Sequence, residues 1–64
     1  MVELNASFSD PERAREAERK LQALRARDIQ HSDGGTSLSA SIEDGIVSRA
    51  LHLIEETGGT ADLH

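Results

Sequence analysis

The residues best suited to chemistry are three consecutive polar side chains ahead of a pair of glycines. His31, Ser32 and Asp33 supply the residue types of a base, a nucleophile and an orienting carboxylate, the combination that nucleophilic catalysis requires. In an extended strand, however, neighbouring side chains point to opposite faces, so these three cannot converge on one atom. We therefore expect no catalytic residues here, and we expect the chain not to be an enzyme.

The second candidate is a loop that could leave backbone groups open to a small ligand. It consists of Asp33, Gly34, Gly35 and Thr36. Its sequence lacks the GxxxxGK[ST] spacing of a phosphate loop, and it precedes an expected strand rather than a helix. The loop is therefore a candidate site for a small ligand such as an amino acid, and not for a phosphate.

A metal site is the third possibility, and the histidines argue against it. His52 and Glu56 are four residues apart and could offer two ligands from one helix face. Two ligands are too few for a structural site, and the chain has no cysteine. His31 is expected to lie half-buried on the helix-facing side of its strand, and the last residue, His64, to be mobile. We expect no metal and no cofactor.

The elements that position these residues follow from two kinds of periodicity. Residues 2–8 and 36–42 alternate apolar and polar side chains, which predicts two half-buried strands. Residues 27–31 form a weaker strand with Ile29 as its one apolar anchor, and residues 60–64 could form a short last strand.

Two amphipathic helices are predicted between these strands. The first spans about residues 10–25, where Ser9 and Glu12 have the spacing of a capping box. The second has Asp44 as its expected cap, carries a broad apolar face and ends at the glycine pair that begins with Gly58.

The strands on either side of the central glycines are expected to form a β-hairpin, and their register limits the loop length. A two-residue loop at Gly34-Gly35 sets Ile29 opposite Ala40, and one that begins a residue earlier sets it opposite Leu38. Both keep Ile29 on the apolar face, whereas a three-residue loop turns it to the polar face. We therefore predict an even-length loop, with positive φ at the glycines.

The order strand, helix, strand, strand, helix, strand predicts an α+β fold of the ferredoxin-like, or split βαβ, type. One domain, residues 1–64, is expected to form a four-stranded antiparallel sheet in spatial order 4-1-3-2, with both helices on one face. If the weak strand 27–31 does not form, the fold is a three-stranded βαβαβ arrangement. A chain this short buries roughly 60% of its unfolded surface, so we expect it to gain stability by association.

In that plan the two central strands turn a polar face away from the helices. Its side chains are small, mostly hydroxyl-bearing and weakly acidic: Glu3, Asn5, Ser7, Ser37, Ser39 and Ser41. Such a face is either solvated or a contact surface, because short side chains let another protein approach closely. These six residues are the candidate binding surface, and the unpaired edges of the two short strands are a second one.

Composition excludes several classes of partner. Twelve acids against seven bases give a formal net charge of −5, which opposes binding to nucleic acid. The one aromatic residue, Phe8, does not provide the rings on which bases stack. The sequence shows neither a secretory signal nor an apolar run long enough to span a membrane. The absence of cysteine fits a cytoplasmic protein, which is the location we expect.

The segment ASFSDPERAREAERKLQAL resembles the first strand and helix of sporulation-related repeat domains, and SLSASIEDGIVSRALHLIEETGG resembles their second half in outline. The same opening is similar to that of small bacterial stress-protein domains. These resemblances imply a βαββαβ fold and, from the first family, peptidoglycan binding. The chain departs from that function because it lacks an export signal and the aromatic residues that stack on sugars. No site residues are transferred from either family.

The sequence therefore predicts a small acidic protein that acts by protein contact, as a homodimer or with another protein. Two other functions stay open: a regulatory module that senses a small ligand through residues 33–36, and a peptidoglycan-binding domain. We expect neither nucleic acid nor membrane among the partners.

Overall fold

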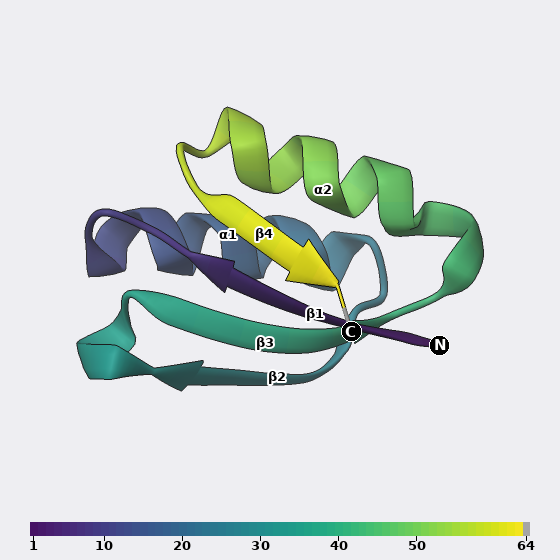
Figure 1. Ribbon diagram of the computed structural model, residues 1–64, viewed down its shortest axis with the longest axis horizontal. Coiled ribbons are helices and arrows are strands. Elements are labelled where there is room, and N and C mark those ends of the chain that lie inside the picture. Colours follow the sequence, from purple (N-terminus) through teal and green to yellow (C-terminus); the bar gives the residue numbers. More distant parts are fainter. Residues whose placement is uncertain (64) are drawn as a thin grey trace.

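The chain folds into one antiparallel sheet with both helices on the same face (Figure 1). The structure, a computed structural model, describes residues 1–63 apart from the Asp33 side chain, so His64 lies outside the described residues. The elements are β1 (Val2–Ser7), α1 (Pro11–Ala23), β2 (Arg27–Ser32), β3 (Ser37–Ile42), α2 (Val47–Glu56) and β4 (Thr60–Leu63). The strand order β2-β3-β1-β4 confirms the predicted α+β class and is that of a ferredoxin-like plait. Because β2 forms, the three-stranded alternative is wrong.

Helix α1 begins where a proline fixes the backbone. Asp10 is the N-cap, and its Oδ1 accepts a hydrogen bond from the amide of Arg13 at 2.9 Å. The predicted capping box on Ser9 is therefore wrong. Pro11 suits the first helical position because it has no amide to satisfy, and this makes the preceding residue the cap.

Helix α2 begins later than predicted. A 3₁₀ turn, Asp44–Ile46, precedes it, and within this turn the amide of Ile46 donates to the carbonyl of Glu43 at 3.0 Å. Asp44 therefore does not cap the helix, and the prediction of its role is wrong. Its Oδ1 instead lies 3.3 Å from the amino nitrogen of Met1, so that carboxylate pairs with the start of β1.

Both helices end in the same hydrogen-bonded turn, a Schellman motif. At the end of α1 the amide of Ala26 donates to the carbonyl of Leu21 at 3.0 Å, and Arg25 takes the left-handed conformation with φ 63°. At the end of α2 that conformation belongs to Gly58, with φ 89°. The next residue, Gly59, donates its amide to a carbonyl one turn back at 2.9 Å. The predicted glycine stop of α2 is confirmed.

The β2–β3 hairpin has an even-length loop that is longer than predicted. Ser32 pairs with Ser37, so residues 33–36 form the loop. A 3₁₀ turn, Asp33–Gly35, occupies this loop. Because of it, residues 33 and 36 are not strand partners, as they would be beside a two-residue turn. The predicted loop length of two residues is therefore wrong. The register of the two strands is nevertheless the one predicted for a turn at Gly34-Gly35. Both have positive φ, 70° and 92°, as predicted.

Strand β2 contains a bulge, which the regular alternation of the sequence did not indicate. Gln30 pairs with Ser39 but Arg27 pairs with Ser41, so two residues on β2 oppose one on β3. Asp28 lies in the bulge with φ 53°. The extra residue leaves Ile29 packed against the core and brings Arg27 to the face of the sheet that points away from the helices.

The core fills the single layer between the sheet and the two helices. Its buried members are Leu4, Ala6, Phe8, Ala14, Ala17, Leu21, Leu38, Ala40, Ile42, Ala50 and Ile54. Five of the eleven are alanines, which brings the helices close to the sheet but limits the apolar surface that is buried. A core of this composition is consistent with the marginal stability expected for a chain of this length.

Replacing Gly34 and Gly35 together by valine is expected to lower the melting temperature. No atom lies within 4 Å of a Cβ at Gly34, so the cost arises from positive φ and not from crowding. Left-handed backbone costs about 1–2 kcal/mol per residue with a side chain, and each kcal/mol lowers the melting temperature of a small domain by roughly 4–8 °C. Thermal unfolding followed by circular dichroism measures the effect.

The matched control for this variant is Gly45→Val, because Gly45 has open space around it and no positive φ. It should leave the melting temperature nearly unchanged. An equal loss in both proteins would contradict the positive φ at the hairpin glycines.

Candidate interaction surfaces

The side chains that point away from the helices form an open face of three rows across the sheet. The register aligns Arg27, Ser41 and Glu3 in the first row; Gln30, Ser39, Asn5 and Asp62 in the second; and Ser32, Ser37, Ser7 and Thr60 in the third. All six residues of the predicted binding surface lie here together. Their shared face is therefore confirmed, and their role in binding stays a prediction.

The charges on this open face are separated by sign. Among the described residues, Arg27, on the edge strand β2, is the one base of this face. Its two acids, Glu3 and Asp62, lie on β1 and on the other edge strand, β4. Between them the face carries short hydroxyl and amide side chains. The two sides of the described face therefore carry opposite charge.

A small hollow lies at the hairpin tip, against the start of α1. Its volume is about 380 Å³, and Arg15, Glu18, His31, Gly34 and Gly35 are among the residues that line it. His31 Nε2 donates to Glu18 Oε1 at 2.7 Å, and the two side chains are 32% and 29% exposed. His31 thus lies on the helix-facing side, as predicted, although the residue as a whole is exposed and not half-buried.

The neighbours of His31 take no part in that contact. Ser32 belongs to the open face, so its side chain and that of His31 lie on opposite sides of the sheet. The side chain of Asp33 lies outside the described residues. This histidine–carboxylate pair ties the hairpin to α1, and sequence reasoning missed Glu18 because the partners are thirteen positions apart in the chain.

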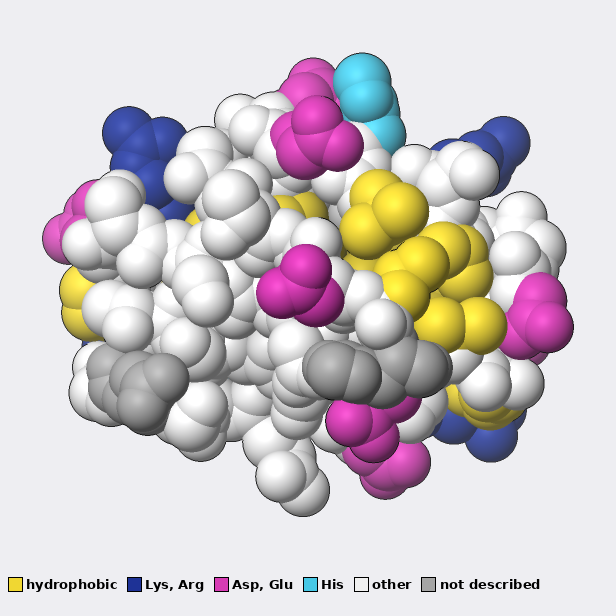
Figure 2. Space-filling view, viewed as in Figure 1, with side chains coloured by type: hydrophobic (Ala, Val, Ile, Leu, Met, Phe, Trp, Pro, Cys, Tyr) yellow, Lys and Arg dark blue, Asp and Glu magenta, His cyan; other side chains and the backbone are white. Residues whose placement is uncertain are grey.

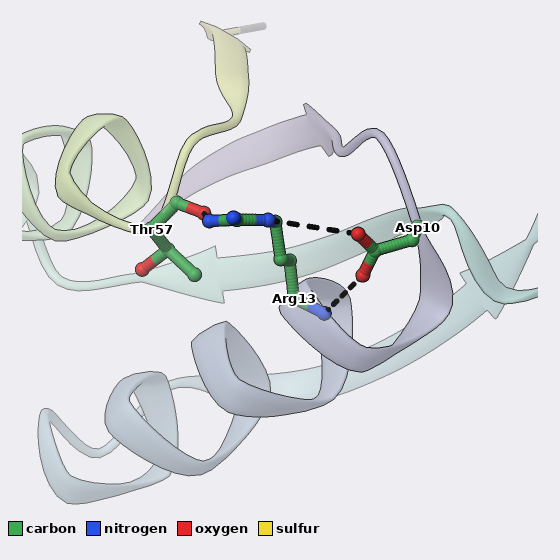
Figure 3. Close-up of polar contacts among 3 residues, drawn as sticks. All are labelled: Asp10, Arg13 and Thr57. Carbon is green, nitrogen blue, oxygen red and sulfur yellow. Dashed lines mark hydrogen bonds and ion pairs between the residues drawn. The ribbon is translucent and has the colours of Figure 1, made fainter.

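A second polar contact ties the start of α1 to the end of α2 (Figure 3). Arg13 Nη1 donates to the carbonyl oxygen of Thr57 at 3.2 Å, while its Nε lies 3.6 Å from Asp10 Oδ2. The Thr57 hydroxyl is itself used, because Oγ1 donates to the Leu53 carbonyl at 2.7 Å. These contacts join the start of α1 to the end of α2 and stabilise both helix ends.

The pair His52–Glu56 is exposed, as predicted. His52 Nε2 lies 3.1 Å from Glu56 Oε1, with side chains 76% and 65% exposed. In the part of the chain that the structure describes, no group of three or more histidines or acids is placed to hold a metal ion.

An apolar groove runs between α2 and the outer side of β4. It has a volume of about 620 Å³, and its lining includes Leu51 and Glu55 from α2 and Ala61 from β4. Leu63, the next residue on the same side of β4, is 45% exposed. Figure 2 shows apolar side chains gathered beside β4 and under the first half of α2, with acidic side chains on either side of them. The sequence signal for this groove is the unusually wide apolar face of α2.

The acidic character of the chain is concentrated in the second half of its sequence. Residues 1–32 contain six acids and six bases, whereas residues 33–64 contain six acids and one base, so the whole net charge of −5 belongs to the second half. That one base, Arg49, lines a different groove, between α2 and α1, together with Lys20 and His52.

Comparisons with known proteins add no identification: no family model matches the chain, and no curated protein or solved structure matches it. The fold class and the surfaces described above are therefore the basis for assigning a function. No helix within residues 1–63 is long and apolar enough to cross a membrane.

Proposed function

We propose that this protein is a non-catalytic interaction domain that acts as a homodimer, paired through the open face of its sheet. The observation that carries the proposal is the separation of charge on that face, with Arg27 at one side and Glu3 and Asp62 toward the other. A surface with opposite charges on its two sides can complement itself across a two-fold axis.

The geometry of such a pair follows from the strand order. A two-fold axis that runs along the strands, between two facing sheets, sets β2 of one copy over β4 of the other. Arg27 is then within reach of Asp62 of the second copy, and the reverse contact forms at the same time. The short side chains of the central strands, among them Ser39 and Asn5, let the two sheets approach closely.

The expected dimer is weak. Strand spacing and rise give this face about 400 Å² per copy, below the roughly 800 Å² per partner of a standard stable interface. We therefore expect association that depends on concentration, with a dissociation constant on the order of 10 μM.

The test is the mass in solution, measured by light scattering over a range of concentrations. The wild-type mass should rise toward that of two copies at about 100 μM. Ser39→Tyr places a ring in the middle row, where it should hold the two sheets apart and leave a monomer. The variant should still fold, since tyrosine suits a strand. Ser48→Tyr adds the same ring at an exposed position of α2, away from the open face, and should behave like wild type. A monomer at every concentration would overturn the proposal.

A small-ligand module is the competing function, and the hollow at the hairpin tip favours it. Arg15 and Glu18 line that hollow together with the predicted loop glycines Gly34 and Gly35, so it offers both signs of charge to a zwitterion. A thermal-shift screen against amino acids and nucleotides separates the two functions. Stabilisation by one class of compound would support the ligand module, and no response would favour the interaction domain.

A further inference from the structure

The structure points to a second interaction surface, distinct from the open face. We propose that the free edge of β4, with the apolar groove beside it, binds an extended basic segment of another protein by strand addition. The inference concerns a separate face and does not depend on the homodimer.

The two edge strands of the sheet differ in how well they could accept another strand. Strand β2 carries the bulge at Asp28, and a bulge of this kind interrupts the regular spacing of backbone groups and protects an edge from pairing. Strand β4 pairs with β1 in unbroken register from Thr60 to Leu63. Among the described residues its other side faces no strand, so β4 is the edge that presents a regular set of donors and acceptors.

The groove gives an added strand a place for its side chains. In an added strand, alternate side chains point to the helix side and to the open face. Those on the helix side would lie over Leu51 and Ala61, in the groove of about 620 Å³, and next to the exposed Leu63. Those on the other face would lie beside Asp62, which neighbours the edge on that side. Main-chain hydrogen bonds then provide affinity and the alternate pockets provide specificity.

Charge selects the partner. Asp62 lies on β4 and Glu55 lines the groove, while Arg49, the one base of the second half, is on the α1 side of α2. A second copy paired through β4 would bring these acids against their own counterparts, which opposes association. An alternating segment would set its apolar side chains in the groove and its basic side chains beside Asp62, with the charge of Glu55 nearby, so the occupant is a basic strand from a different protein.

The probe is a capped peptide of about eight alternating lysines and valines. We would titrate it into isotope-labelled Ser39→Tyr protein, which removes self-association through the open face, and follow the amide chemical shifts. Saturable changes are expected in Thr60–Leu63 and around Leu51, and they should weaken as salt is raised. Peptides with serine for valine or glutamate for lysine should not bind.

A matched pair of variants isolates the role of charge. Glu55→Gln with Asp62→Asn should lower the peptide affinity about fivefold, since each exposed pair contributes only modestly. Glu43→Gln with Glu56→Gln changes the net charge by the same amount away from the groove and should leave the affinity unchanged.

Three results would overturn the inference. The first is equal binding of the lysine and glutamate peptides, and the second is an equal effect of the two double variants. The third is a shift of the β4 amides on dilution of the protein alone, which would show that a second copy occupies this edge. Failure of the homodimer proposal would instead appear as a monomeric wild-type mass, with the peptide result unaffected.

Discussion

Replacing Leu21 by alanine is expected to remove a large share of the stability of the protein. Leu21 lies on the inner face of α1 and has no exposed surface. Truncation of a buried leucine lowers the free energy of unfolding by about 2–5 kcal/mol, and a single core at this chain length supplies only about 3–5 kcal/mol in total. One cavity therefore removes a large share of the stability.

Urea unfolding followed by circular dichroism measures this loss, since the chain has no tryptophan or tyrosine for fluorescence. Leu53→Ala is the control because it makes the same chemical change at a half-buried position on α2. It should retain a folded baseline and lose less than half as much stability. If the two variants unfolded at the same urea concentration, the position of Leu21 at the centre of the core would be wrong.

A single methyl group at Gly59 is expected to lower the free energy of unfolding by about 1–3 kcal/mol. A Cβ there would lie 2.5 Å from Cε2 of Phe8 and 2.8 Å from the carbonyl oxygen of Ser7. The ring is nearly buried and the carbonyl belongs to the end of β1, so neither neighbour can move freely. The turn from α2 into β4 therefore requires glycine at this residue for close approach.

Two further variants test that explanation for Gly59→Ala. Gly45→Ala adds the same methyl group in open space and should change the melting temperature little. Phe8→Leu combined with Gly59→Ala should recover part of the loss, because it removes the ring atoms that the methyl group meets, and a double-mutant cycle gives the coupling. Strict additivity of the two substitutions would show that Phe8 is not the obstacle.

Periodicity was sufficient to predict the architecture of this protein. Alternation in residues 2–8 and 36–42 identified the central strands, and the two amphipathic stretches identified the helices that cover them. The register rule worked for the hairpin because a one-residue slip would have moved Ile29 off the core. These signals are reliable where burial of one face forces every second or every third to fourth residue to be apolar.

The errors lie where local geometry competes with pattern. Ser9 and Asp10 both have the chemistry of a cap, and the position of Pro11 decides between them. Asp44 could also cap a helix, but it lies in a 3₁₀ turn and its carboxylate pairs with the amino group of Met1. The bulge at Asp28 leaves no trace in the apolar pattern, since it keeps Ile29 on the core side.

The candidate surfaces could be predicted only in part. The open face follows from alternation, so its six predicted residues were found, but Arg27 reaches it only through the bulge. The contacts of Glu18 with His31 and of Arg13 with Thr57 join elements far apart in the chain. The groove beside β4 depends on how α2 lies against an edge strand, and no residue spacing within either element specifies that.

The central place of β1 in the sheet governs the order in which this chain can assemble during synthesis. β1 leaves the ribosome first of all the strands, yet its two neighbours are β3 and β4. It has no partner until Ile42 has been made, and its other edge stays open until Leu63 has followed. The local hairpin of β2 and β3 can form earlier. Completion of the sheet therefore waits on the pairing with the largest sequence separation, which makes folding of the nascent chain a late event.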